Sequence, residues 1–201
     1  MATAAVDIPD RRGREALLGV LARAFRDNPM NRAIHGPNPK RRVRANRAGL
    51  RSLVLDLHPW TESRVIANEN GVLGGFIAVP PGGFPLPAAS LWRQLGCLVG
   101  QGARAMDRWG FVTETLRREQ PTAPHWYVAA LGVEPEHRGQ GLGGRLLDSL
   151  HALAAGTPYP IYLESDRPES VSFYRSRGFE ILGESRPLGV PCWRLGCDPM
   201  T

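Results

Sequence analysis

The stretch from Trp126 to Leu150 constrains the fold more than any other part of the sequence. It opens with an unbroken apolar run, Trp126–Val133, whose length and residue types predict a buried strand. A proline-containing turn (134–137) and a glycine-rich segment (138–144) lead into a helix that carries Leu146, Leu147, Leu150 and Leu153. This order predicts an anion site, because the first amides of a helix lack internal partners and glycines let a phosphate approach the backbone closely.

Three kinds of phosphate-binding loop share this order, and spacing separates them. A Walker loop ends in Gly-Lys-Ser/Thr, whereas this one ends in Gly-Gly-Arg (143–145) and has no hydroxyl to hold magnesium. The dinucleotide fingerprint G-x-G-x-x-G is literally present from Gly139 to Gly144, with Glu164 about twenty residues further on. However, five residues (134–138) separate the strand from the first glycine, and too little chain follows for a run of βα units. The context therefore argues against a Rossmann domain.

The third kind is the acetyl-CoA loop of the GNAT N-acyltransferase superfamily, which this segment resembles closely. Its pattern, Q/R-x-x-G-x-G/A after a strand and a short turn, is met by Arg138 to Gly143, with Val133 and Pro135 at the expected places. About fifty further residues continue the resemblance: 160–164 resembles the next strand, and 172–179 resembles the F-Y-x-x-x-G-F helix and turn. The alternative is a structural glycine turn in an unrelated α/β domain.

Within the superfamily, the chain is most similar to the small-molecule branch that includes puromycin N-acetyltransferase, although its N-terminal half matches only in layout. The resemblance implies an α/β (α+β) fold, with a mixed central sheet, helices on both faces and a splayed central strand pair. It also implies that residues 1–201 form one domain and that acetyl-CoA is bound. The residues assigned to acetyl-CoA are Leu131, Gly132, Val133, Arg138, Gly139, Gln140, Gly141, Leu142, Gly143 and Gly144.

Catalytic roles follow from the same resemblance. Tyr174, in the F-Y motif, is expected to protonate the departing thiolate, because a phenol with an ordinary pKa of about 10 keeps its proton at neutral pH. Its alternative role is that of a core tyrosine. Glu164 is the first candidate base, and the weaker candidates are Glu114, Glu119 and His125. Arg167 stands where many relatives carry Asn, which is a departure from the family pattern.

Composition narrows the class of protein. The hydrophobic fraction of 42% and the charged fraction of 22% are ordinary for a soluble protein, and the net charge of +6 suits polyanions such as CoA, nucleic acid or an anionic membrane. Cys97, Cys192 and Cys197 have no metal-ligand spacing and predict reduced thiols, so no metal is expected. Neither a signal peptide nor a membrane span is recognisable, which predicts a cytoplasmic protein.

The rest of the chain is expected to add helices and strands around this centre. Helices are predicted over 10–27, 40–57, 88–106, 107–120 and 169–177, the last capped by Asp166. Strands are predicted over 64–68, 72–79, 179–183 and 192–197, with a short extended piece at Val6 and Ile8. Asn70-Gly71 predicts the hairpin turn, and Gly74-Gly75 predicts a bulge or a close backbone approach.

Acceptor-site walls are expected in the loop after the first helix and in the helices between the hairpin and the central strand. The candidates are Phe25, Asp27, Met30, Trp92, Met106, Trp109 and Phe111, each with an alternative role in core packing or capping. The helix over 40–57 carries basic residues along one side. A solvated face is the preferred interpretation over a wall for RNA or an acidic acceptor, because no aromatic residues interleave for base stacking.

The sequence as a whole therefore predicts an acetyl-CoA-dependent N-acetyltransferase that acts on a primary amine of a small molecule. Because no cysteine has an acyl-enzyme context, direct attack in a ternary complex is expected. The alternatives are a protein N-terminal or lysine acetyltransferase, a non-catalytic acyl-CoA-binding module, and an RNA-binding protein using the 41–51 helix. Neither a nucleic-acid nor a membrane partner is expected, and a homodimer is left open.

Overall fold

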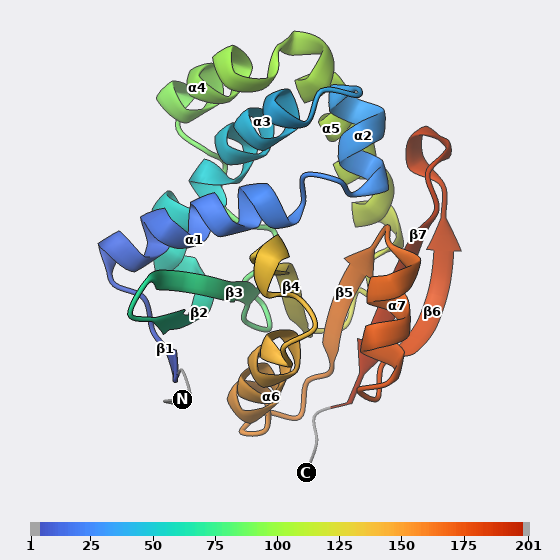
Figure 1. Ribbon diagram of the computed structural model, residues 1–201. Helices are drawn as coiled ribbons and strands as arrows, with labels where there is room; N and C mark the ends of the chain where they lie inside the picture. Colours follow the sequence, from blue (N-terminus) through green and yellow to red (C-terminus); the bar gives the residue numbers. More distant parts are fainter. Residues whose placement is uncertain (1–4, 199–201) are drawn as a thin grey trace.

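A seven-stranded sheet runs through the protein in the order β1-β2-β3-β4-β5-β7-β6 (Figure 1). The computed structural model describes residues 5–198. The strands are β1 (Val6–Asp7), β2 (Glu62–Asn68), β3 (Gly71–Val79), β4 (Trp126–Val133), β5 (Ile161–Ser165), β6 (Glu180–Ser185) and β7 (Cys192–Cys197). Within the described residues β4 and β5 pair in parallel, and the other neighbours pair antiparallel. The predicted mixed sheet, with helices on both faces, is confirmed.

In residues 5–198, seven α-helices surround the sheet (Figure 1). They are α1 (Arg11–Ala24), α2 (Pro29–His35), α3 (Pro39–Arg51), α4 (Leu91–Gln101), α5 (Ala103–Glu119), α6 (Leu142–Ala154) and α7 (Pro168–Arg175). The π-helix η1 (Ser52–Asp56) continues α3, and short 3-10 turns lie at η2 (His58–Trp60), η3 (Pro135–His137) and η4 (Pro187–Gly189). Within the described part of the chain, no helix is long and apolar enough to cross a membrane.

Two of the differences from the predicted boundaries have a clear structural reason. The predicted helix over 40–57 is α3 followed by η1, so its last turn is wound more loosely than an α-helix. The break between the two later helices falls at Gly102, where φ is +89°, rather than between Met106 and Asp107. Glycine takes this left-handed backbone without steric cost, and it lets the chain turn from α4 into α5.

The two faces of the sheet are covered by different helices. On one face, Leu17 and Leu21 of α1 pack with Ile77 of β3 and Ala130 of β4. The opposite face is covered by α6 and α7, whose buried leucines and aromatic residues form the larger cluster with β3, β4, β5 and β7. The close backbone approach predicted at Gly74-Gly75 is confirmed, because a Cβ on Gly75 would lie 2.5 Å from the Arg64 carbonyl oxygen and 2.7 Å from Leu17 Cδ1.

A β-bulge in β4 marks the place where the sheet opens. Ile77 pairs with Ala130 and Ala78 pairs with Val128, so Ala129 is an extra residue on β4. Parallel pairing with β5 is limited to Trp126 and Tyr127, just before this bulge. Since a bulge bends its strand and increases the local twist, it accounts for the divergence of β4 from β5 (Figure 1). The result is a gap between two strands in the middle of the sheet.

Candidate active site

The predicted anion cradle is built from two left-handed glycines and a helix N-terminus. Gly139 and Gly141 both have φ of 77°, and α6 begins at Leu142. A Cβ added to either glycine would meet no atom within 4 Å, so the space in front of this backbone is open. Because this conformation strains any residue with a side chain, the two glycines are required to shape the loop.

The next two glycines have a different role. A Cβ on Gly143 would lie 3.3 Å from the Phe173 ring, and one on Gly144 would collide with the Arg177 guanidinium. Arg177 in turn lies over the Phe173 ring and pairs with Asp148 of α6. Gly143 and Gly144 therefore let α7 and the turn that follows it pack closely on the start of α6.

Two arginine contacts fix the loop that precedes the cradle to the end of α1. Arg23 Nε and Nη2 donate to both carboxylate oxygens of Glu134, at 2.6 and 3.0 Å. Arg138 Nη2 donates to the Ala24 carbonyl at 2.7 Å, and burial lowers the pKa of Arg138. The Arg138 guanidinium thus lies at the C-terminal end of α1, where the helix dipole favours a cation. A contact of Arg138 with pyrophosphate stays a prediction.

The main chain at the end of β4 faces the gap. Glu134 N donates to Leu73 O at 2.7 Å, and the register continues with Gly132 opposite Gly75. Hydrogen-bonded and non-hydrogen-bonded pairs alternate in an antiparallel ladder, so the main-chain groups of Leu131 and Val133 point away from β3. Gly132 bonds to β3 instead. Its lack of a side chain makes room for α1, because a Cβ there would lie 3.0 Å from Leu21 Cδ2.

A cavity of about 520 Å³ occupies the gap between β4 and β5. The residues 127–131 of β4 line one side, and residues 163–166 at the end of β5 line another. Residues from the α1–α2 loop, from α2 to α5 and from α7 complete the lining. Three predicted residues meet in this cavity, namely Leu131, Glu164 and Tyr174, whereas the cradle residues 138–144 lie outside it.

Glu164 is a partly buried carboxylate that lines this cavity. Burial raises the pKa of Glu164, and the adjacent phenols of Tyr162 and Tyr127 oppose that shift. Burial also raises the pKa of each phenol, and the negative charge of Glu164 adds to the effect. The carboxylate therefore has a greater proton affinity than an exposed glutamate, whereas both phenols remain neutral at physiological pH.

Tyr174 reaches the same cavity from α7. Its ring packs between Phe173 and Phe179, with ring centroids 5.3 and 5.4 Å away. Only 8% of the residue is exposed, and burial raises the pKa of its phenol. The hydroxyl therefore holds its proton throughout the physiological range, as a general acid must.

The structure does not support Asp166 as the cap of α7. The N-cap position is taken by Arg167, and no side chain caps this helix. Asp166 instead accepts hydrogen bonds from Met30 N at 2.7 Å and from Asn28 Nδ2 at 3.1 Å. The Asp166 carboxylate thus lies at the start of α2, where the helix dipole favours a negative charge. Asp166 thus ties β5 to the α1–α2 loop, across the cavity that both of them line.

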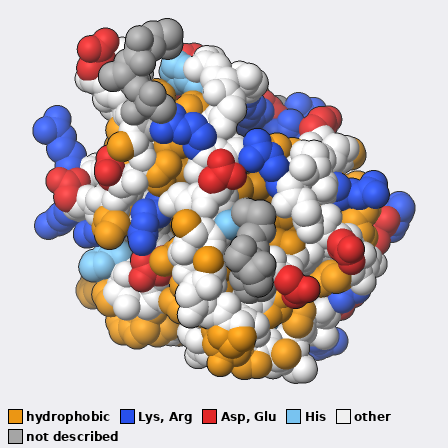
Figure 2. All heavy atoms as spheres, turned by 90° about the horizontal axis from the view of Figure 1, so that it is seen from below, with side chains coloured by type: hydrophobic (Ala, Val, Ile, Leu, Met, Phe, Trp, Pro, Cys, Tyr) orange, Lys and Arg blue, Asp and Glu red, His pale blue; other side chains and the backbone are white. Residues whose placement is uncertain are grey.

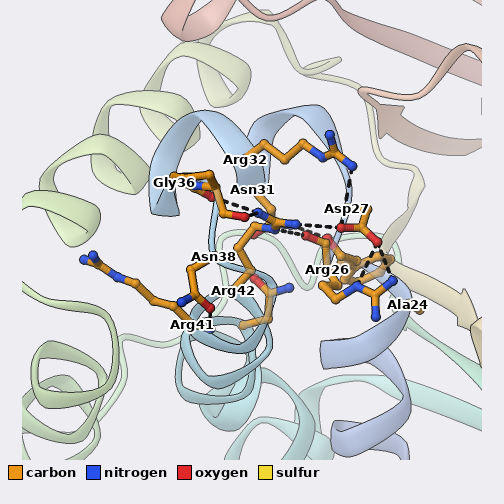
Figure 3. Close-up of polar contacts among 12 residues, drawn as sticks. Ala24, Arg26, Asp27, Asn31, Arg32, Gly36, Asn38, Arg41 and Arg42 are labelled. Carbon is orange, nitrogen blue, oxygen red and sulfur yellow. Dashed lines mark hydrogen bonds and ion pairs between the residues drawn. The ribbon is translucent and has the colours of Figure 1, made fainter.

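Arg42 holds the other side of that loop (Figure 3). Its side chain is buried, and it donates to the carbonyls of Arg26, Gly36 and Pro37 and to Asp27 Oδ1, all within 2.9 Å. Hydrogen bonds and charge from Arg26 and Arg42 lower the pKa of Asp27 to about 2. Asp27, a candidate for the acceptor wall, is therefore part of the structure that fixes the loop, and it does not line the cavity.

The other candidates divide between the cavity and the surface. Phe25, Met30, Met106 and Trp109 line the cavity. Trp92 and Phe111 do not, since they are 83% and 56% exposed on the outer sides of α4 and α5. These two expectations are wrong because helical spacing alone does not show which side of a helix is covered.

The weaker base candidates also lie outside the cavity. Glu114 is paired with Arg117 and Arg118 on the exposed side of α5, and Glu119 pairs with Arg194. His125 contacts the carbonyl of Ala123 and the edge of Tyr162. Among the described residues, no group of His, Cys, Asp and Glu could hold a metal ion.

The basic residues do not form a continuous field. On α3, Arg42 is buried, and Arg47 and Arg51 lie 3.7 and 3.8 Å from Glu15 of α1. On the face shown in Figure 2, lysine and arginine side chains are interspersed with acidic ones. The pairing of Arg47 and Arg51 with Glu15 agrees with the preferred interpretation of the α3 charges as a solvated face.

Comparison with known proteins agrees with this geometry. Residues 94–181, which include the cradle, β5, α7 and Tyr174, match the acetyltransferase (GNAT) domain family. The cradle glycines therefore lie in a segment that matches a GNAT domain, which argues against the Rossmann interpretation of the same glycines.

Individual proteins match part of the sequence, and solved structures match the fold over nearly the whole chain. The N-alpha-acetyltransferase RimI of Mycobacterium tuberculosis is 36% identical over 66 residues, which are 32% of this chain and 42% of that protein. A histone acetyltransferase HPA2-related protein from Corynebacterium glutamicum superimposes with a TM-score of 0.68, 22% identity and coverage of 99% and 98%. An aminoglycoside 6'-N-acetyltransferase complexed with coenzyme A gives a TM-score of 0.59, 13% identity and 98% coverage of both chains. The chain spans between 30% and 45% of the length of the curated relatives it matches.

Proposed function

We propose that this protein is an acetyl-CoA-dependent N-acetyltransferase whose acceptor is a primary amine of a small molecule. One observation supports this most directly: the Leu131 main chain, the partly buried Glu164 carboxylate and the buried Tyr174 phenol all line the gap between β4 and β5, and the Val133 main chain follows on the same strand. The open glycine cradle lies at the end of the same strand. These are the groups that acyl transfer to an amine requires.

The chain has a suitable place for the co-substrate. The amides from Gly139 to Leu142 are suited to a pyrophosphate, because the backbone is open in front of them and α6 begins there. The unpaired main-chain groups of Leu131 and Val133 are suited to the amide groups of pantetheine, which would extend β4 on the side that β5 has left. A solved aminoglycoside 6'-N-acetyltransferase that shares the fold is complexed with coenzyme A, which supports coenzyme A as the ligand.

Acetyl-CoA supplies the acetyl group as an activated thioester. Glu164 accepts a proton from the acceptor ammonium, and its raised pKa makes it a stronger base than an exposed glutamate. The Leu131 amide donates a hydrogen bond where negative charge develops on the carbonyl oxygen, which is worth a few kcal/mol in comparable sites. The Tyr174 hydroxyl keeps its proton until the C–S bond breaks and then donates it to the departing CoA thiolate, which leaves as the thiol.

A small acceptor is favoured because the cavity lies beneath the helices α2 to α5. Its volume of about 520 Å³ falls within the range of sites for small molecules. The local similarity to RimI favours a protein N-terminus as the second candidate, because that relative is named an N-alpha-acetyltransferase.

The test is an acetylation assay that measures the release of free CoA thiol with a panel of small amines and an N-terminal peptide. We expect turnover with small amines, and we expect Glu164→Gln to lower kcat by about 100-fold. Binding of CoA, measured by calorimetry, should stay unchanged in the variant. Binding of CoA without turnover of any amine would contradict the enzyme proposal, and turnover of the peptide alone would replace the acceptor class.

A further inference from the structure

The cavity between β4 and β5 has an uneven distribution of charge. Glu164 and Asp166 are two residues apart on the same strand end, and both line the cavity. Among the described residues of the lining, no other side chain is acidic and none is lysine, arginine or histidine. In a chain with a net charge of +6, this concentration of negative charge favours a cationic group, and it confines that group to the β5 end.

The opposite end of the cavity is formed by α3, α4 and α5. Met106, Trp109, Val112 and Leu116 of α5 provide an apolar wall. The neutral polar residues Asn46 of α3, Gln101 of α4 and Thr113 of α5 join them, and α4 packs on α3 and α5. A second cation at this end would be buried without an opposing charge, which is strongly unfavourable.

Unpartnered oxygen atoms supply the second observation. Asn28 Oδ1, Asn31 Oδ1 and Gln101 Oε1 are buried and accept no hydrogen bond, and all three residues line the cavity. The orientations of the two asparagines are fixed by their amide nitrogens, which donate to Asp166 Oδ1 and to the Phe25 carbonyl. Buried acceptors without partners are rare, so these atoms indicate a ligand that brings donors to them.

From these contacts we infer that the acceptor is an amine with a single cationic nitrogen, and that its body carries neutral hydrogen-bond donors, such as a hydroxyl or an amide N–H, beside an apolar part. The cationic nitrogen lies at Glu164, and a neutral donor lies at the Gln101 end. This inference rests on the proposed function, because it assigns the orientation of the acceptor in the same cavity.

The experiment compares two amines of equal length, 5-aminopentan-1-ol and 1,5-diaminopentane, which differ only in a far hydroxyl or a far ammonium. Calorimetry in the presence of CoA measures binding without turnover, and thiol release from acetyl-CoA measures kcat/KM. We expect the wild-type protein to prefer the amino alcohol by roughly tenfold or more in both measurements. An equal or stronger preference for the diamine would overturn the inference.

A variant that changes the charge at the Gln101 end of the cavity tests the inference in a second way. Gln101→Glu places a carboxylate among the apolar residues, so it should shift the preference toward the diamine by roughly tenfold. Gln94→Glu is the matched control, because Gln94 lies on the same helix, is exposed and does not line the cavity. An equal shift in both variants would overturn the inference, because it would mean that charge at a distance, and not contact in the cavity, determines the preference.

A separate outcome identifies a failure of the proposed function alone. If CoA and the amino alcohol bind as expected but no acetyl group is transferred, the proposed activity is wrong and the inferred ligand class stands. If Gln101→Glu does not fold, which a circular dichroism melting curve would reveal, the wild-type preference between the two amines decides the inference.

Discussion

The two sides of the gap between β4 and β5 are built by different means. The β4 side presents main chain: the amides near Leu131 and the glycine cradle at Gly139 and Gly141 need no particular side chain beyond hydrogen. The β5 and helical sides present side chains, including Glu164 and Tyr174, which come from elements far apart in the sequence. A main-chain site can bind one constant ligand, whereas a side-chain site can change its specificity without changing the fold.

This comparison predicts that substitutions on the β5 and helical sides change kcat, whereas substitutions on the β4 side change the affinity for CoA. The largest effect is expected for Tyr174→Phe, which removes the hydroxyl and keeps the ring between Phe173 and Phe179. We expect kcat to fall by about 100- to 10,000-fold with unchanged affinity for CoA, because only a proton donor is lost. Thiol-release kinetics and calorimetry measure the two quantities. Tyr159→Phe is the control at an exposed tyrosine, and equal rates in both variants would mean that Tyr174 has a packing role alone.

A smaller effect is expected for Gly141→Ala, which lies on the β4 side of the gap. Alanine at a φ of 77° is strained by about 1–2 kcal/mol, and its methyl group would project into the open space before the cradle. We expect the Kd for CoA, measured by calorimetry, to increase roughly tenfold, with little change in the KM for the amine. Gly156→Ala is the matched control, because Gly156 also has free space but no left-handed backbone. Unchanged CoA affinity in Gly141→Ala would argue against a ligand at the cradle.

The smallest effect concerns stability. Since burial raises the pKa of Glu164 above its value in the unfolded chain, its contribution to stability is complete below the unfolded pKa of about 4.3 and is lost as the pH rises through the folded pKa. Glutamine does not ionise, so Glu164→Gln removes this loss of stability at high pH. We therefore expect the variant to melt about 2–4 °C above the wild-type protein at pH 8, with the difference vanishing near pH 4. Melting curves at several pH values measure this, and a variant that melts lower at pH 8 would show that the charged carboxylate stabilises the fold.

The β4 side of the gap, which presents main chain, could be predicted from sequence because its features depend on neighbouring residues. The bounds of β4, the glycines at 139 and 141 and the start of α6 follow from residues close together in the chain. Tyr174 and Glu164 were found through the motif that contains them, and both line the cavity. Each of these features depends on a few neighbouring residues, so its pattern is visible in one sequence.

The β5 and helical sides of the gap, which present side chains, could be predicted only in part. Asp166 has an ordinary capping position before a proline, and nothing local reveals that its partners are Asn28 and Met30. Arg42 looks like one more charge on a basic helix, although it is among the most buried polar residues. The Ala129 bulge is set by pairing with β3, which no local pattern encodes. These features depend on contacts between residues that are distant in the sequence.

The short parallel pairing of β4 with β5 has a mechanical consequence. Because the two strands are in register only at Trp126 and Tyr127, the strands β1 to β4 and the strands β5 to β7 meet along a short seam at one end. Trp126 and Ile161 are both buried at this seam within the same core cluster. A molecule bound between the strands would bend the sheet about this seam. Because the seam is firmly packed, the far end of the gap would widen or narrow while the fold stays intact.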